Sequence, residues 1–201
     1  EHPVTEEVTG IDLVAEQIKI ARGDGLEFAQ DDIDWHGHAI EARLYAEDPG
    51  NNFLPEIGTL HAYDTSLASE VRWDSGVEEG SVIGTDFDPM LSKVISWAPN
   101  RIDAANKLAR GLEKAHMGGV VTNRQFLISC LRNENFLRGN TTTDFIEREA
   151  LKTKKNLSIN ELHQTSTAVT LWLAQQNRVS DSVTGFMPAN WTNGRIPLQR
   201  V

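Results

Sequence analysis

The spacing of hydrophobic residues changes twice along this chain, and this change limits the folds open to it. From residue 9 to about 23, apolar side chains recur every three to four positions, as on a helix with one buried face. Between about 35 and 97 they recur at every second position, as in strands with one covered face. After residue 102 the helical spacing returns. The order predicts an α+β domain in which an antiparallel sheet has flanking helices.

Individual elements follow from the same spacing and from local end signals. The first helix is predicted to begin at Thr9, with Asp12 as its capping partner, and to end at Gly23. The clearest strand covers residues 40–46, where apolar and polar side chains alternate. Further strands are expected at residues 58–63, 70–73 and 91–97, and further helices at 102–112, around 126–131 and at 143–151.

Composition excludes two classes of partner. The 201 residues carry 29 Asp and Glu against 19 Lys and Arg, a formal net charge of −10, which opposes binding to a nucleic-acid backbone. No run approaches the ~18 apolar residues that cross a bilayer, and the first residues lack the pattern of a signal peptide. The single cysteine, Cys130, cannot form an internal disulfide. We therefore expect no nucleic-acid or membrane partner and a reducing, cytoplasmic location.

Two polar groupings are candidates for a functional site. The polar side of the strand at residues 40–46 carries Glu41, Arg43 and Tyr45 and continues to Glu47. A guanidinium flanked by carboxylates on a rigid strand can hold an oxyanion. An exposed face whose charges pair with one another explains the same pattern, and the pattern alone favours that simpler interpretation. Asp88 precedes the last predicted strand, where it is interpreted first as a turn-capping residue and second as a site residue.

His36 and His38 are candidates for a metal site, because they stand two apart and share a strand face. The period-two phasing places Glu41 on the opposite face, so buried or edge histidines are the preferred interpretation. The chain contains no P-loop run, and no pairing of a nucleophile with a histidine is signalled.

Several ordered runs resemble the C-terminal part of biotin carboxylase, the ATP-grasp enzyme of biotin-dependent carboxylases. They are Glu1-His2-Pro3-Val4-Thr5-Glu6, Gly37-His38-Ala39-Ile40-Glu41-Ala42-Arg43 with Ala46-Glu47-Asp48-Pro49, Phe53-Leu54-Pro55, Val71-Arg72-Trp73-Asp74, Asp88-Pro89-Met90-Leu91-Ser92-Lys93, Thr122-Asn123 and Asn135-Phe136. The resemblance covers residues 1–150, which we expect to form a biotin carboxylase C-terminal domain. Residues 1–25 would be the end of the ATP-grasp region.

The remaining residues resemble a narrower group. A Pro-x-x-Trp-x-Asn run at residues 188–193 follows an apolar helical patch and is similar to the entry of the bridging domain in acyl-CoA carboxylase α-subunits, of the acetyl-CoA or propionyl-CoA carboxylase type. We expect residues 151–201 to be a linker helix and the start of such a bridging domain. The equivalent region of a pyruvate, methylcrotonoyl-CoA or urea carboxylase is the alternative.

The resemblance implies ATP-dependent carboxylation of biotin. Bicarbonate attacks the γ-phosphate to give carboxyphosphate, and biotin deprotonated at its ureido nitrogen captures the released carbon dioxide. Glu1 matches the general base for bicarbonate, and Arg43 matches the arginine that holds the biotin enolate oxygen. Supporting positions are Glu41 and Asp88 for the biotin and bicarbonate pocket, Thr143 for the adenine edge and Arg72 for a dimer surface.

The resemblance also implies ligands and partners. ATP, Mg²⁺, bicarbonate and carrier-bound biotin would be used, with a biotin carboxyl carrier domain, a carboxyltransferase subunit and a second copy of the chain as partners, in the cytoplasm or, in a eukaryote, the mitochondrial matrix. The family's nucleotide lysines and magnesium-binding carboxylates would lie before Glu1, and the chain lacks an initial Met. We therefore expect a C-terminal fragment that holds no metal and is inactive alone. A non-catalytic association module is the competing hypothesis.

Overall fold

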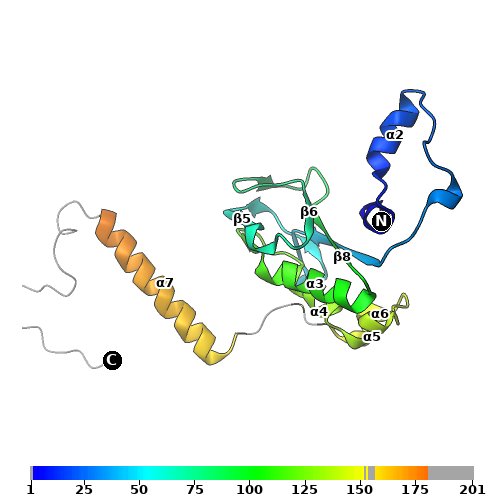
Figure 1. Cartoon of the computed structure of the whole chain (residues 1–201). Coiled ribbons are helices and arrows are strands. Elements are labelled where there is room, and N and C mark those ends of the chain that lie inside the picture. Colours follow the sequence, from blue (N-terminus) through cyan, green and yellow to red (C-terminus); the bar gives the residue numbers. More distant parts are fainter. Residues whose placement is uncertain (1, 152, 154–156, 181–201) are drawn as a thin grey trace, which may run out of the picture. The chain divides into compact units, whose positions relative to one another are not determined.

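The computed structural model describes residues 2–151, 153 and 157–180, and the chain divides into two units, residues 1–155 and 156–201. The helices of the first unit are α1 (His2–Thr9), α2 (Leu13–Ala21), α3 (Arg101–Lys114), α4 (Arg124–Leu131), α5 (Glu134–Arg138) and α6 (Phe145–Glu149) (Figure 1). The second unit contributes α7 (Ile159–Ser180). The predicted bridging-domain motif at 188–193 lies outside the described residues, so the assignment of the two parts to named domains stays a prediction.

The strands form one three-stranded sheet and three short pairs. The main sheet has the order β1 (His38–Tyr45), β8 (Met90–Ala98), β6 (Arg72–Ser75), and both of its pairings are antiparallel. The short antiparallel pairs are β2 (Glu47–Asp48) with β3 (Leu54–Pro55), β4 (Gly58–Thr59) with β7 (Val82–Ile83), and β5 (Ala62–Asp64) with β9 (His116–Gly118). The predicted antiparallel sheet with flanking helices is confirmed.

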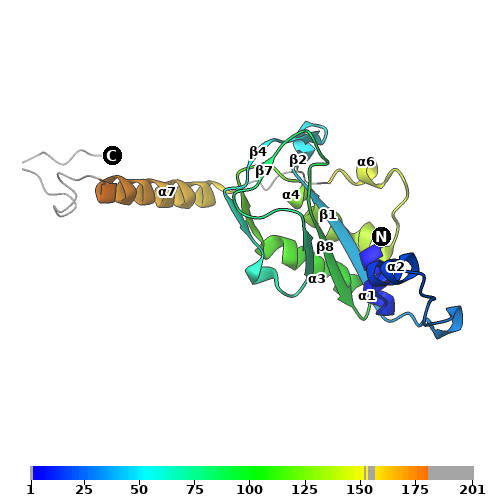
Figure 2. The same ribbon diagram turned by 90° about the horizontal axis from the view of Figure 1, so that it is seen from above.

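One face of the main sheet forms the hydrophobic core together with α3, which lies beside β1 and β8 (Figure 2). Leu44 on β1 and Val94 on β8 are fully buried, as is Leu108 on α3. Asn100 caps the start of α3, because its side chain accepts a hydrogen bond from the backbone N–H of Asp103. Burying the apolar stripe of α3 against this face stabilises the domain, because the free energy gained grows with the apolar area removed from water.

The first predicted helix was wrong at its start. The chain forms two helices there, because Gly10 adopts a left-handed φ of 75° and separates α1 from α2. Thr9 ends α1, and its hydroxyl donates to the carbonyl of Thr5. Asp12 is the true cap, since its side chain accepts from the N–H of Ala15 in α2. The predicted end at Gly23 is confirmed, with α2 closing at residue 21 and Gly23 at φ 95°.

The predicted strand at residues 58–63 is divided. Its two halves, β4 and β5, pair with different strands, and the change of partner occurs at Leu60, which is fully buried. The N–H of Leu60 donates to the carbonyl of Ser81, whereas the N–H of His61 donates to the carbonyl of Gly118. Alternation of side chains cannot reveal a change of partner, so the sequence pattern indicated one strand.

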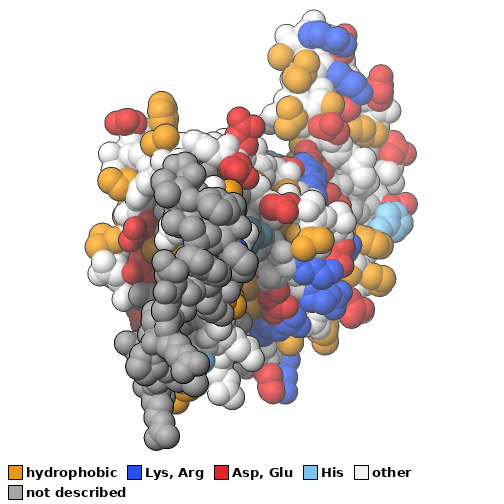
Figure 3. Space-filling view, turned by 90° about the vertical axis from the view of Figure 1, so that its left-hand side faces the viewer, with side chains coloured by type: hydrophobic (Ala, Val, Ile, Leu, Met, Phe, Trp, Pro, Cys, Tyr) orange, Lys and Arg blue, Asp and Glu red, His pale blue; other side chains and the backbone are white. Residues whose placement is uncertain are grey.

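Charged side chains of both signs are interspersed over the surface shown in Figure 3, with hydrophobic side chains scattered among them. Within residues 2–151, 153 and 157–180, no helix is long and apolar enough to cross a membrane. Cys130 on α4 is partly buried, and its burial raises the pKa of the thiol to about 11.

Candidate functional site

On the face of the main sheet opposite α3, side chains lie in two rows across the strands, and all of them except Ile95 are charged. Strand pairing gives the rows Glu41, Ile95, Arg72 and Arg43, Lys93, Asp74. Residues directly opposite one another on antiparallel strands share a face. The sheet therefore brings Glu41 and Arg43 on β1 to the same side as Arg72 on β6, and these are three of the residues singled out from the sequence. We call this surface the polar face.

Arg43 and Glu41 form an ion pair of unequal exposure. Arg43 Nε lies 3.5 Å from Glu41 Oε1, and the Arg43 side chain is 47% exposed whereas that of Glu41 is only 6% exposed. The carboxylate is thus shielded while the guanidinium reaches the surface. Alternation along β1 predicts that Glu41 and Arg43 share a side of the strand. The ion pair between them is the one expected for an exposed face whose charges pair with one another. A fixed guanidinium with a shielded partner can also hold an anion from solution.

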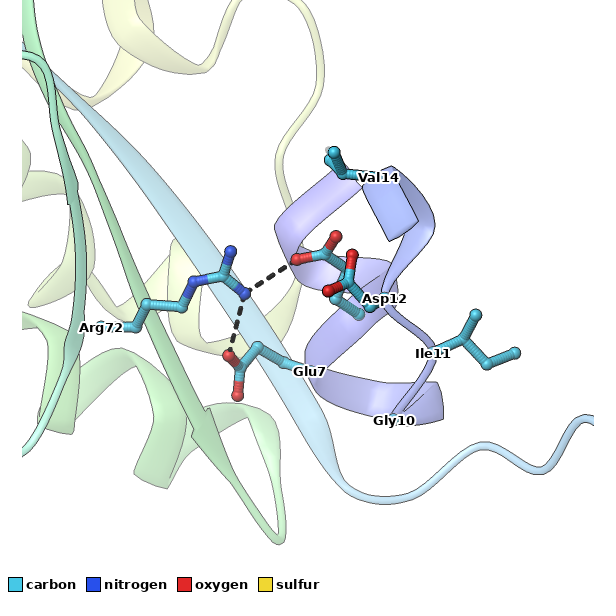
Figure 4. A pocket seen from close by; sticks show the side chains of 7 residues that line it. Glu7, Gly10, Ile11, Asp12, Val14 and Arg72 are labelled. Atoms are coloured by element: carbon cyan, nitrogen blue, oxygen red, sulfur yellow. Dashed lines mark hydrogen bonds and ion pairs between the residues drawn. The ribbon is translucent and has the colours of Figure 1, made fainter. Parts of the chain in front are cut away.

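Helix α1 is attached to the polar face through Arg72. Arg72 Nη1 donates to Glu6 Oε2 at 2.8 Å and to Glu7 Oε1 at 3.4 Å (Figure 4). Its Nε donates to Asp74 Oδ1 at 2.9 Å. Hydrogen bonds to Asp74, and then to Glu6 and Glu7, raise the pKa of Arg72. Arg72, Glu6 and Glu7 line a cavity of about 600 Å³ together with Gly10, Ile11, Asp12 and Val14. Arg72 therefore binds within its own chain, and its role at a dimer surface stays a prediction.

Glu1, the predicted general base, lies outside the described residues. The next residue, His2, begins α1, which packs against β1 and β8. The role of Glu1 stays a prediction.

Asp88 lies close to a second carboxylate at the start of β8. Its Oδ1 accepts a hydrogen bond from the N–H of Met90 at 2.8 Å, which is the turn-capping geometry expected from the sequence. Burial, and after it the negative charge of Asp88, raises the pKa of Glu47 on β2. The structure thus places Asp88 near Glu47, which the sequence groups with Glu41 and Arg43 on the polar side of the strand.

Replacing Asp88 by Asn is expected to lower the pKa of Glu47, because one of its two causes is removed. A raised carboxyl pKa in the folded state stabilises the fold below the unfolded pKa, and this contribution is lost as pH rises through the folded pKa. Asp88→Asn should therefore reduce the loss of stability on raising the pH through that range. The titration can be followed by the ¹³C chemical shift of the Glu47 carboxyl. Asp86→Asn is the control, and an equal shift in both variants would contradict the assignment.

The remaining candidates lie on other elements. Thr143 is an exposed residue in the turn that leads into α6, and nothing places it on the polar face. His38 Nε2 lies 3.3 Å from Arg101 Nη1, and burial together with that positive charge lowers its pKa. No group of three or more His, Cys, Asp or Glu suited to a metal occurs among the residues that the structure describes. His38 is thus held beside an arginine at the start of an edge strand.

Asn123 was named in the sequence only as part of a motif, without a role. The structure shows it buried, with 6% of its surface exposed, and bonded to β1 on either side of Leu44. Asn123 Nδ2 donates to the carbonyl of Arg43 at 3.1 Å, and the N–H of Tyr45 donates to Asn123 Oδ1 at 3.0 Å. An Asn just before a helix predicts a cap, so no local signal could have revealed these contacts.

Comparison with known proteins decides the family. Residues 41–148 match the biotin carboxylase C-terminal domain, which is more than half of the chain. The chain belongs to the biotin carboxylase C-terminal domain family. Residues 1–29 match the carbamoyl-phosphate synthase L chain, ATP binding domain. The resemblance drawn from the ordered motifs is confirmed at this level.

Relatives of this biotin carboxylase C-terminal domain are longer proteins. Biotin carboxylase 2 of Bacillus subtilis is 42% identical over 74% of the chain and 33% of its own length. The mitochondrial methylcrotonoyl-CoA carboxylase subunit alpha of Rattus norvegicus is 36% identical over 97% of the chain and 28% of its own length. The chain thus spans about a third or less of these curated relatives.

Solved structures show the same fold. The biotin carboxylase domain dimer of 2-oxoglutarate carboxylase from Hydrogenobacter thermophilus, in complex with MgADP, ADP and bicarbonate, is similar with a TM-score of 0.72 at 37% identity. That match covers 75% of this chain and 33% of the other chain.

Proposed function

We propose that this domain works within a biotin-dependent carboxylase that uses ATP and bicarbonate to carboxylate biotin by way of carboxyphosphate. The observation that carries the proposal is the half-exposed guanidinium of Arg43, held on a paired strand with the shielded carboxylate of Glu41 beside it, in a domain of this family. Such a charge is already in place when negative charge develops on the reacting groups, so little reorganisation is needed.

The residues of this chain have separate parts in the proposed reaction. Arg43 holds the enolate oxygen of deprotonated biotin, and Glu1 removes the proton of bicarbonate. Glu41 orients Arg43, and Asp88 supports the pocket from the start of β8. Thr143 is proposed at the adenine edge of ATP on the resemblance alone. The relatives extend well beyond the length matched here, and we propose that this extra length holds the nucleotide phosphates and Mg²⁺.

The test is an assay of the full-length protein with ATP, bicarbonate and free biotin. Phosphate release should depend on bicarbonate, and ¹⁴C from bicarbonate should appear in carboxybiotin. The 201-residue chain alone should show neither activity. ATP cleavage at a rate that does not depend on bicarbonate would contradict the proposal. Labelled biotin formed by the 201-residue chain alone would contradict it as well.

The downstream acceptor belongs to a carboxyltransferase partner, which would receive the carboxyl group from a biotin carrier domain. The Pro-x-x-Trp-x-Asn run supports an acetyl-CoA or propionyl-CoA carboxylase, whereas the similarity of the rat methylcrotonoyl-CoA carboxylase over 97% of the chain supports that enzyme type. Carboxylation assays of the full-length protein with its partner subunit and each acyl-CoA would separate the two. The mitochondrial relative supports a matrix location in a eukaryote, and a cytoplasmic one is proposed otherwise.

Association between copies is a second candidate function, because a similar domain was solved as a dimer. Sedimentation of the 201-residue chain tests it. A strict monomer at micromolar concentration would contradict dimerisation through this domain.

A further inference from the structure

Asn123 occupies the position before the first residue of α4, where an asparagine side chain usually caps the helix. Here it makes no capping hydrogen bond, although α4 begins at the next residue. A capping asparagine stabilises its helix, so the absence of that contact here needs an explanation. The side chain is directed to β1, where both of its amide atoms are bonded.

The contacts of Asn123 replace those of a missing strand. Among the described residues, β1 pairs with β8 on one side, and Asn123 binds its other edge. Beyond the two side-chain bonds, the N–H of Asn123 donates to the carbonyl of Tyr45 at 3.1 Å. Asn123 thus binds three backbone groups of β1, namely the carbonyl of Arg43 and both the N–H and the carbonyl of Tyr45. We call this arrangement the Asn123 clamp.

The clamp lies where the β1–β8 pairing is irregular. The register shifts between Leu44 and Tyr45, next to the backbone groups that Asn123 binds. A β-bulge disrupts the ladder and lets a strand bend. The hydrogen bonds from Asn123 therefore fix the backbone of β1 at Arg43. At this point the hydrogen bonds between β1 and β8 alone hold the strand less firmly.

We propose that Asn123 is a positioning residue for Arg43, a role that rests on the proposed function. The side chain of Arg43 projects from a backbone whose carbonyl is bound by Asn123, so the clamp sets the point from which the guanidinium reaches the biotin oxygen. Removing the amide leaves the Arg43 carbonyl and the Tyr45 N–H without these bonds, and β1 is then free to shift. A misplacement of about 1 Å can cost about a hundredfold in rate.

A double-mutant cycle in the full-length protein tests the role. Asn123→Ala should lower the kcat of biotin carboxylation about 10- to 100-fold while the KM for ATP stays within about twofold. In an Arg43→Ala background, Asn123→Ala should add less than about a twofold loss, because its effect passes through Arg43. Independent, multiplying losses would overturn the proposal.

Ser96→Ala is the matched control. The buried hydroxyl of Ser96 on β8 donates to the carbonyl of Ala104 on α3 at 2.8 Å, on the face of the sheet opposite Arg43. Its loss also removes a buried hydrogen bond and lowers the melting temperature, but it should leave turnover unchanged. If Asn123→Ala slows turnover no more than Ser96→Ala does, the clamp does not position Arg43.

Two further results separate the clamp from the proposed function. Amide hydrogen exchange at Tyr45 should accelerate in Asn123→Ala and stay unchanged in Ser96→Ala, and unchanged exchange in both would overturn the clamp itself. A wild-type protein without bicarbonate-dependent carboxylation of biotin would overturn the proposed function, and the positioning role with it. Active wild-type protein together with an unaffected Asn123→Ala variant would overturn the positioning role alone.

Discussion

Arg43→Ala in the full-length protein is expected to lower biotin carboxylation about a hundred- to a thousandfold, the usual cost of losing one donor to a developing oxyanion. The guanidinium offers two parallel N–H donors at a fixed point of β1, and alanine offers none. Arg43→Lys keeps the charge but loses the planar fork, so its turnover should fall between those of the wild type and of Arg43→Ala. Fixation of ¹⁴C-bicarbonate into biotin measures all three proteins.

Arg138→Ala is the control for a lost surface arginine. Arg138 on α5 is 69% exposed and pairs with Glu134 on the same helix. Exposed pairs of this kind contribute about 0.3–0.5 kcal/mol, so neither stability nor turnover should change appreciably. Wild-type turnover in Arg43→Ala would remove Arg43 from the mechanism.

Gly119→Ala is expected to lower the free energy of unfolding by about 2–5 kcal/mol, the sum of a backbone cost and a steric cost. Gly119 has φ 115°, and a Cβ added there would lie 2.0 Å from the carbonyl oxygen of Thr59 and 2.8 Å from the N of His61. Both atoms belong to backbone, so the segment that joins β4 to β5 would have to move. Urea unfolding of the 201-residue chain, followed by circular dichroism, measures the loss.

Gly80→Ala separates the two costs. Gly80 has φ 89°, and nothing lies within 4 Å of its added Cβ. It should therefore lose only the backbone part, about 1–2 kcal/mol. Equal losses at the two glycines would show that the contact with Thr59 is relieved at no cost.

The elements predicted well from sequence are those with one face in the core. β1 alternates over residues 41–45 because one of its sides packs on α3, and α3 repeats Leu108 and Leu112 at helical spacing for the same reason. β8 is buried on both faces at Val94 and Ile95, so there its burial does not alternate. The spacing of apolar residues did not predict α1, because only Pro3 and Val8 are buried among its eight residues. Periodicity detects a buried stripe, and α1 has almost none.

The candidate site was predictable within a strand and not between strands. Alternation placed Glu41 and Arg43 on one side of β1, but pairing partners such as Lys93 and Arg72 depend on register, which turn chemistry and the core decide. Asn123 binds Arg43 across 80 positions of sequence and shows the usual local signature of a helix cap. Its local sequence predicts that Asn123 caps α4, so its contacts with β1 can be found only when the fold is known.

The Asn123 clamp also bears on aggregation through the edge of β1. An edge strand presents unpaired N–H and C=O groups that can recruit a strand from another molecule and so begin aggregation. On β1 the edge groups at Arg43 and Tyr45 are already bound by the residue that precedes α4, within the same chain. The residue that fixes Arg43 therefore also closes part of a surface on which intermolecular β-sheets could otherwise form.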